Sequence, residues 1–275
     1  MGFQINTNTA ANTAYRNLSS TQGDMSKSLE KLSSGLRINR AADDAAGLAI
    51  SEGLRSQIGG LGVAARNAQD GISVVQTAEG ALTEVHSILQ RVRDLAVQSG
   101  NDSNNAEART AIQTEVTALG DELSRIATST NFNGTDLLSS AATSLTFQVG
   151  AGSDAANDQI SVAATDIEAV ATAVKTLTFV DSAAALTSIA ELDTQITAVS
   201  SARSELGAVQ NRFESAINSI NVTQENLSAA KSRITDTDMA KEMADFTRAN
   251  ILSQAGTAML AQANQMNQGV LQLLR

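Results

Sequence analysis

Residues that could perform chemistry are few in this chain and lie far apart. His86 is the only histidine, cysteine is absent, and no His-Glu-x-x-His motif occurs. A site built on paired imidazoles or on a cysteine nucleophile is therefore excluded within one chain. His86 follows the apolar position Val85, and we expect it at the surface or at the boundary of the core. The sequence predicts no enzymatic activity, no cofactor and no metal ion.

Two short patterns that resemble ligand sites have structural interpretations. Asp43 and Asp44 precede a helical apolar pattern, where acidic residues cap a helix and interact favourably with its N-terminal end. Gly59, Gly60 and Gly62 are neither preceded by a predicted strand nor followed by Lys-Ser or Lys-Thr, as a phosphate-binding loop requires. We interpret these glycines as a flexible joint between helices.

The composition favours long helices that pack closely. The 275 residues include no proline, no tryptophan, six phenylalanines and one tyrosine, and small and aliphatic residues dominate the apolar fraction. The formal net charge is −10 without a basic cluster, which argues against nucleic-acid binding. No apolar stretch has the length of a membrane span, and the first residues do not resemble a secretory signal peptide. We therefore expect no membrane insertion, and export by another signal if the chain is exported.

Both ends of the chain carry apolar residues at helical spacing. In the first stretch, gaps of three and four residues alternate, and the predicted coiled-coil seam consists of Tyr15, Leu18, Gln22, Met25, Leu29, Leu32 and Leu36. The last stretch follows a break at 235–238 and carries Met239, Met243, Phe246, Leu252, Ala255, Met259, Ala263, Met266, Val270 and Leu274. Both ends are therefore predicted to form amphipathic helices.

The middle of the chain combines helices with a short β-structure. Apolar spacing predicts one helix from Val75 to Ala96 and a second, antiparallel helix from Ile112 to Ile126. Alternation of apolar and polar residues in 145–149 and 160–162 predicts a β-hairpin that must lie on the helices. The segment 166–181 is ambiguous and stays unassigned. From 182 to 234 the spacing is again helical.

These elements define a mainly α fold class, an elongated antiparallel helical bundle or coiled coil formed by both chain ends, with a small β-hairpin region in the middle of the chain. We expect five segments along the chain. They are an N-terminal helix at 1–42, further helices at 43–130, the hairpin and a short segment at 131–181, a long helix at 182–235, and a C-terminal helix at 236–275.

The terminal seams predict self-association. Two such helices can pair, but one pair leaves the flanks of both apolar stripes exposed to water. Neighbouring copies could cover what remains, and contacts between different patches on the two partners produce an open helical array. We expect the core of this assembly to contain Tyr15, Leu18, Met25, Leu29, Leu32, Leu36, Phe246, Leu252, Met259, Val270, Leu271, Leu273 and Leu274.

Longer strings in both halves resemble the bacterial flagellins. In the N-terminal half they include LSSGLRIN at 32–39, DDAAG at 43–47 and LQRVRDLAVQ at 89–98. In the C-terminal half they include ILSQA at 251–255, AMLAQANQ at 258–265 and VLQLLR at 270–275. Strings of this length are highly specific, and the short middle indicates a form without large central variable domains.

The resemblance implies a structural subunit of the extracellular flagellar filament, used for swimming motility. It also implies export in an unfolded state by the flagellar type III apparatus, and an export chaperone and the filament cap as partners. By the same resemblance, a Toll-like receptor of the host would contact Gln90, Arg91, Leu95 and Glu115. Cytosolic flagellin sensors would contact the apolar end at Val270, Leu271, Leu273 and Leu274.

Two other functions stay open at this point. The hook–filament junction protein of the flagellum resembles flagellin at both ends, although the unbroken C-terminal string favours flagellin. A coiled-coil effector or adhesin exported by a type III system would also be acidic, helical and free of cysteine. Such a protein would not need matched seams at both ends.

Overall fold

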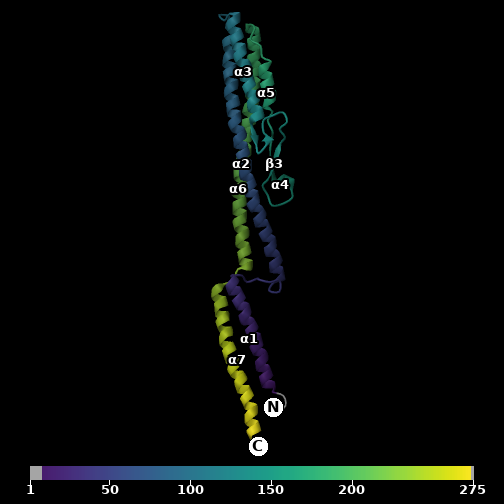
Figure 1. The fold of residues 1–275 in the computed structure, drawn as a ribbon, viewed down its shortest axis with the longest axis vertical. Helices are drawn as coiled ribbons and strands as arrows, with labels where there is room; N and C mark the ends of the chain where they lie inside the picture. The colour runs from purple at the N-terminus through teal and green to yellow at the C-terminus, as the bar shows by residue number, and fades with distance from the viewer. Residues whose placement is uncertain (1–7, 274–275) are drawn as a thin grey trace. The chain divides into compact units, whose positions relative to one another are not determined.

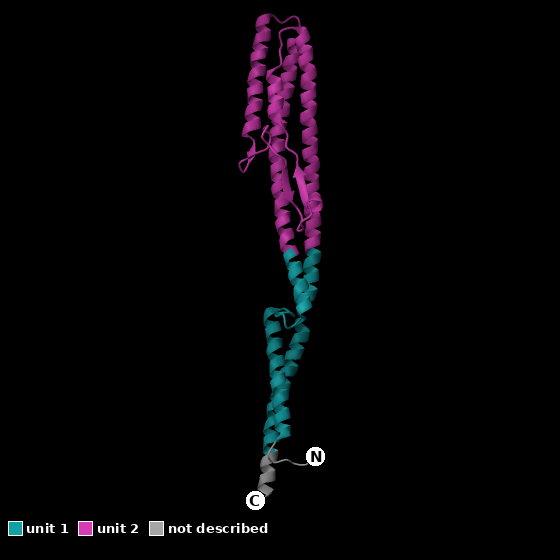
Figure 2. Ribbon diagram, turned by 90° about the vertical axis from the view of Figure 1, so that its right-hand side faces the viewer, with its two compact units in different colours: residues 1–56, 225–275 teal, residues 57–224 magenta. Residues whose placement is uncertain are grey.

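A computed structural model describes residues 8–273 of the chain, which form helices α1 to α7 and two small antiparallel sheets. The chain divides into two compact units (Figure 2). Unit 1 comprises 1–56 and 225–275, and unit 2 comprises 57–224. The predicted mainly helical class with a central hairpin is confirmed.

Unit 1 is built on the antiparallel pair of α1 (Thr9–Ser34) and α7 (Met239–Leu273), which lie side by side (Figure 1). Asn8 caps α1, because its side-chain oxygen accepts a hydrogen bond from the Ala11 amide at 3.0 Å. The helix ends at Gly35, whose φ of 72° is in the left-handed region that glycine adopts without strain. Asn8 also donates to the Ala263 carbonyl at 3.0 Å, which ties the first turn of α1 to α7.

A short joint in unit 1 connects these helices to the next ones. The joint brings together 35–44, before α2 (Ala45–Ser99), and 236–238, after α6 (Ser182–Thr235). The Arg37 amide donates to the Thr235 carbonyl at 2.6 Å, and the Thr237 amide donates to the Gly35 carbonyl at 3.0 Å. The Arg37 guanidinium adds a bond of 2.7 Å to the Ile234 carbonyl. These bonds hold the two connections against each other.

Unit 2 packs α2 and α6 with α3 (Ala106–Ser129) and α5 (Ile167–Lys175). Asn105 caps α3 by accepting the Ala108 amide at 2.8 Å. The core is continuous, and its largest fully buried side chains include Leu82, Leu89, Leu123, Phe179 and Phe213.

Two hairpins lie in unit 2. β1 (Asn131–Phe132) and β2 (Thr135–Asp136) are joined by Asn133 and Gly134, both with positive φ. β3 (Leu145–Gln148) pairs with β4 (Gln159–Val162), and the short helix α4 (Ala155–Asp158) lies in the connection between them. This strand pair is the predicted hairpin. Phe147 of β3 contacts Phe213 of α6 edge to face, with ring centroids 5.6 Å apart.

One interpretation of the sequence needs correction. The predicted joint at Gly59, Gly60 and Gly62 is wrong, because α2 is continuous from Ala45 to Ser99. Glycine only weakens a helix, and at Gly60 the missing side chain permits close packing: an added Cβ would lie 3.0 Å from the Ala151 Cβ. The expected domain limits at 42/43 and 235/236 lie in the joint before α2 and at the end of α6, and they stay predictions; the division into two compact units falls within α2 and α6.

Among residues 8–273, no helix combines the length and the apolarity needed to cross a lipid bilayer.

Candidate functional site

The face of α1 that packs on α7 differs in part from the predicted seam. The buried and half-buried positions along it are Ala11, Ala14, Leu18, Thr21, Met25, Ser28 and Leu32. Leu18, Met25 and Leu32 belong to the predicted seam. Its other apolar members are exposed, and the small residues Ala14, Thr21 and Ser28 occupy the inner positions instead.

The inner face of α7 is also lined largely by small residues. Ala249 and Ala263 are buried, and Ser253 and Gly256 are half-buried on the same side. An added Cβ at Gly256 would lie 3.2 Å from the Leu18 Cδ1, so the two helices approach closely there. Close approach through small residues leaves little room for large side chains between the helices.

The large apolar side chains of the pair are therefore directed elsewhere. Tyr15 and Met259 are each 65% exposed, Ile251 is 61% exposed and Leu252 is 53% exposed. Leu29, Leu36, Met239 and Met243 are exposed as well. Isolated exposed apolar residues are ordinary, but a helix pair that fills much of its contact with small residues and leaves this many large apolar side chains exposed indicates an interaction surface.

We define the outer apolar surface as Tyr15, Leu29, Leu36, Met239, Met243, Ile251, Leu252 and Met259. Of the predicted assembly residues, Leu18, Met25, Leu32 and Phe246 are half-buried between the helices. Val270, Leu271 and Leu273 lie in α7, but their side chains are outside the described part of the chain, and Leu274 is outside the described residues.

Hydrogen bonds to two carboxylates organise the joint of unit 1. The backbone amides of Arg40 and Asn39 donate to Asp43 and hold its pKa below the ordinary value. The hydroxyls of Ser232 and Thr235 donate to Asp236 and lower its pKa in the same way. Asp44 accepts the Gly47 amide at 2.8 Å, which is the predicted capping role of the acidic pair.

The residues predicted to contact a Toll-like receptor lie in unit 2. Arg91 of α2 and Glu115 of α3 form an ion pair with an Nη2 to Oε1 distance of 2.7 Å, and both are exposed. Gln90 is exposed and its Nε2 lies 2.9 Å from the Nε2 of His86. Leu95 is only 3% exposed and packs in the core, so it offers little surface to a partner.

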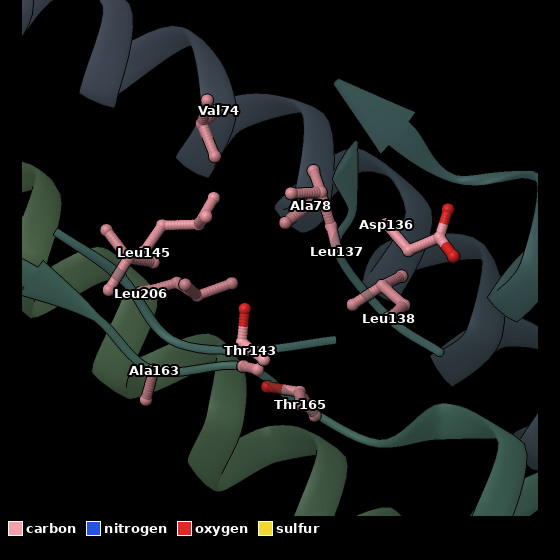
Figure 3. Close-up of a pocket in the computed structure, with 12 residues that line it drawn as sticks. Val74, Ala78, Asp136, Leu137, Leu138, Thr143, Leu145, Ala163, Thr165 and Leu206 are labelled. Carbon is pink, nitrogen blue, oxygen red and sulfur yellow. The ribbon is translucent and has the colours of Figure 1, made fainter. Parts of the chain in front are cut away.

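Residues 8–273 contain no group of three or more ligating side chains that could hold a metal ion. A cavity between α2, α6 and the hairpin segments is lined mainly by apolar side chains, including Val74, Leu137, Leu145 and Leu206 (Figure 3). Its volume is about 20 Å³, close to that of one water and far below that of a ligand site.

Comparison with known proteins defines the class. The family model of the bacterial flagellin N-terminal helical region matches residues 5–143, and that of the C-terminal helical region matches residues 189–274. The chain therefore belongs to the bacterial flagellin family, whose members are structural proteins of the flagellar filament and not enzymes.

Individual relatives agree with this assignment. A flagellin of Halalkalibacterium halodurans is 52% identical over 271 residues, which cover 98% of this chain and 99% of the relative. A flagellin of Bacillus subtilis is 51% identical over 307 aligned positions, which cover 99% of this chain and all of the relative. The crystal structure of Bacillus cereus flagellin is 34% identical with a TM-score of 0.51, and the match covers 60% of this chain and 94% of that one.

Proposed function

We propose that the outer apolar surface of α1 and α7 joins copies of this chain in the flagellar filament. As a flagellin, the chain is a subunit that polymerises with itself into this extracellular structure. The observation that supports the surface is the number of large apolar side chains that the helix pair leaves exposed, among them Ile251, Leu252 and Met259. Burial of exposed apolar side chains of this size against a neighbouring copy would lower the free energy of the assembly.

The energy of covering them is large enough to drive assembly. Burial of apolar surface contributes roughly 25 cal/mol per Å², so about 400 Å² per subunit would contribute roughly 10 kcal/mol. This gain must offset the loss of translational and rotational freedom, which costs at least about 4 kcal/mol. In an array each subunit contacts several neighbours, so the remaining gain accumulates.

The buried cores of the two units differ, and this difference also supports a role of the outer apolar surface in assembly. Unit 2 has a continuous core of buried Leu, Val, Ile and Phe side chains. Among the residues whose burial is described, up to 265, that core includes none of α1 or α7, and the buried apolar residues of α7 are Ala249 and Ala263. Unit 1 has the weaker core of the two, so we expect assembly to stabilise its helices.

Truncation tests this proposal. Deletion of 240–275 removes nearly all of α7, and we expect a soluble chain with a folded unit 2 that no longer polymerises. Sedimentation and electron microscopy measure polymerisation, and circular dichroism measures the helical content of unit 2. Normal filaments from the truncated chain would refute the assembly argument.

A second interaction concerns the exposed face around Arg91. We propose that Gln90, Arg91 and Glu115 contact a Toll-like receptor of a host, since the ion pair places a guanidinium and a carboxylate at an exposed position on neighbouring helices. Arg91→Ala should weaken receptor signalling, because it removes the guanidinium and leaves Glu115 unpaired. Arg125→Ala, which removes a similar exposed pair with Glu122 on α3 alone, is the matched control. Unchanged potency of Arg91→Ala in a signalling assay would remove this assignment.

Further partners follow from family membership. We propose that an export chaperone and the filament cap bind this chain, and that type III export precedes its folding. Cytosolic sensors of flagellin would bind the C-terminal apolar residues, including Leu271 and Leu273. Polymerisation through the outer apolar surface would cover part of the chain that such partners need, so these partners should prefer the free subunit.

A further inference from the structure

The outer apolar surface contains a chemically reactive group. Met239, Met243 and Met259 are 48%, 51% and 65% exposed; Met239 and Met243 lie about one turn apart on α7, and Met259 lies on a different exposed side of the same helix. A thioether is apolar enough to pack between helices, but peroxides oxidise it when they can reach the sulfur. Nearly half or more of each of these side chains is accessible in the single chain.

The residues that mild oxidation attacks are confined to one of the two units. The chain has six methionines, no cysteine and no tryptophan. None of the six methionines lies in unit 2, because they occupy positions 1, 25, 239, 243, 259 and 266. Mild oxidation therefore changes unit 1 and leaves the core of unit 2 chemically intact.

We propose that Met239, Met243 and Met259 are oxidation-sensitive positions of α7 that control polymerisation of the free subunit. A peroxide converts the three thioethers to sulfoxides, and the oxidised subunit does not polymerise until they are reduced. This inference rests on the proposed role of the outer apolar surface in assembly.

The reaction needs a peroxide and no group from the protein. The sulfur donates an electron pair to one oxygen of hydrogen peroxide, the oxygen–oxygen bond breaks and a sulfur–oxygen bond forms. A proton moves to the departing oxygen, which leaves as water. The sulfur is oxidised by two electrons and the peroxide is reduced by two. Methionine sulfoxide reductases reverse the change with electrons from a thiol.

Oxidation acts on assembly because it changes polarity at the contact. The sulfoxide oxygen is a strong hydrogen-bond acceptor, and water satisfies it in the free subunit. A neighbouring copy would bury it against apolar side chains without a donor. Burial of one sulfoxide oxygen without a donor weakens association about tenfold or more. The critical concentration for polymerisation should therefore rise by at least about that factor.

The test compares polymerisation before and after oxidation of the full chain. Free subunits are treated with dilute hydrogen peroxide, the peroxide is removed with catalase, and mass spectrometry verifies sulfoxide at the three positions. We expect a critical concentration raised about tenfold or more, an unchanged unfolding transition of unit 2, and recovery after treatment with methionine sulfoxide reductase. Peroxide applied to assembled filaments should oxidise the three positions more slowly.

Two variants separate these positions from the other methionines. M239L/M243L/M259L keeps an apolar surface without sulfur, and it should polymerise equally well before and after peroxide treatment. Met25→Leu, which changes the half-buried methionine between α1 and α7, should stay as sensitive as the unmodified chain. Oxidised subunits that polymerise at an unchanged critical concentration would overturn the proposal, as would a triple variant that stays sensitive. Failure of the untreated chain to polymerise would instead refute the proposed function.

Discussion

The same substitution at two glycines of α2 should change stability in opposite directions. At Gly71 an added Cβ would lie 2.6 Å from Cζ and 2.8 Å from Cε1 of Phe213. Phe213 is fully buried and contacts Phe147 of the hairpin, so its ring has little freedom to move. At Gly80, on the same helix, an added Cβ has no atom within 4 Å apart from its local helix neighbours.

The magnitudes follow from two opposing effects. Alanine stabilises a helix interior relative to glycine by about 1 kcal/mol, and this gain applies at both positions. Overpacking at Gly71 costs about 1–3 kcal/mol, whereas Gly80→Ala carries no such cost. The two variants should therefore differ by about 1–3 kcal/mol in the free energy of unfolding, with Gly71→Ala the less stable. For a domain of this size the difference corresponds to ~2–4 °C in Tm per kcal/mol.

Thermal and urea unfolding, followed by circular dichroism, measure this difference. A shorter side chain at 213 should relieve the contact, so Gly71→Ala should be better tolerated in a Phe213→Leu background. The reasoning is refuted if Gly71→Ala and Gly80→Ala are equally stable, because the ring of Phe213 then does not restrict the space above Gly71.

Two further predictions concern local structure. The lowered pKa of Asp43 means that its stabilisation of the joint is present above the ordinary pKa of 3.8 and is lost as the pH falls through the lower folded value. Protection of the Asn39 and Arg40 amides against hydrogen exchange should fall in that pH range. Asp43→Asn keeps an acceptor but does not titrate there, so it should abolish the pH dependence of this protection. Gly134→Ala should lower the stability of unit 2 by ~1–2 kcal/mol in urea unfolding, because the turn holds position 134 at a φ of 79°; an unchanged midpoint would show that the turn can adopt another conformation.

Several elements were predictable because their signals are local. The helical periods at both ends, the returning helix α3 and the β3–β4 hairpin follow from residue spacing and are present in the structure. The sequence pattern does not assign helix α5, although Asp166 is a capping residue and Ile167, Val170, Ala171 and Val174 have helical spacing. A run of nine residues rich in alanine and β-branched residues is too short for periodicity alone to separate helix from strand.

The side of α1 that faces α7 was harder to predict. The predicted seam correctly includes Leu18, Met25 and Leu32, which face α7. It also includes the large side chains of Tyr15 and Leu29, which are exposed. Heptad spacing identifies an apolar stripe and does not say which edge of a wide stripe meets the partner helix. Leu95 shows a related limit, since Gln90 and Arg91, which were expected on the same contact surface of α2, are exposed while Leu95 is buried in the core.

The sequence by itself determined that both ends of this chain are helices with apolar stripes and that long strings place it among the flagellins. It also excluded a histidine pair and a cysteine nucleophile within one chain. Periodicity and residue type are properties of the chain alone. Tertiary structure decided which residues of each stripe are inside. The small residues of α1 and α7 allow the two backbones to approach closely, and this approach directs Tyr15, Leu252 and Met259 outward. Packing between helices distant in sequence sets that choice, and no single helix carries the information.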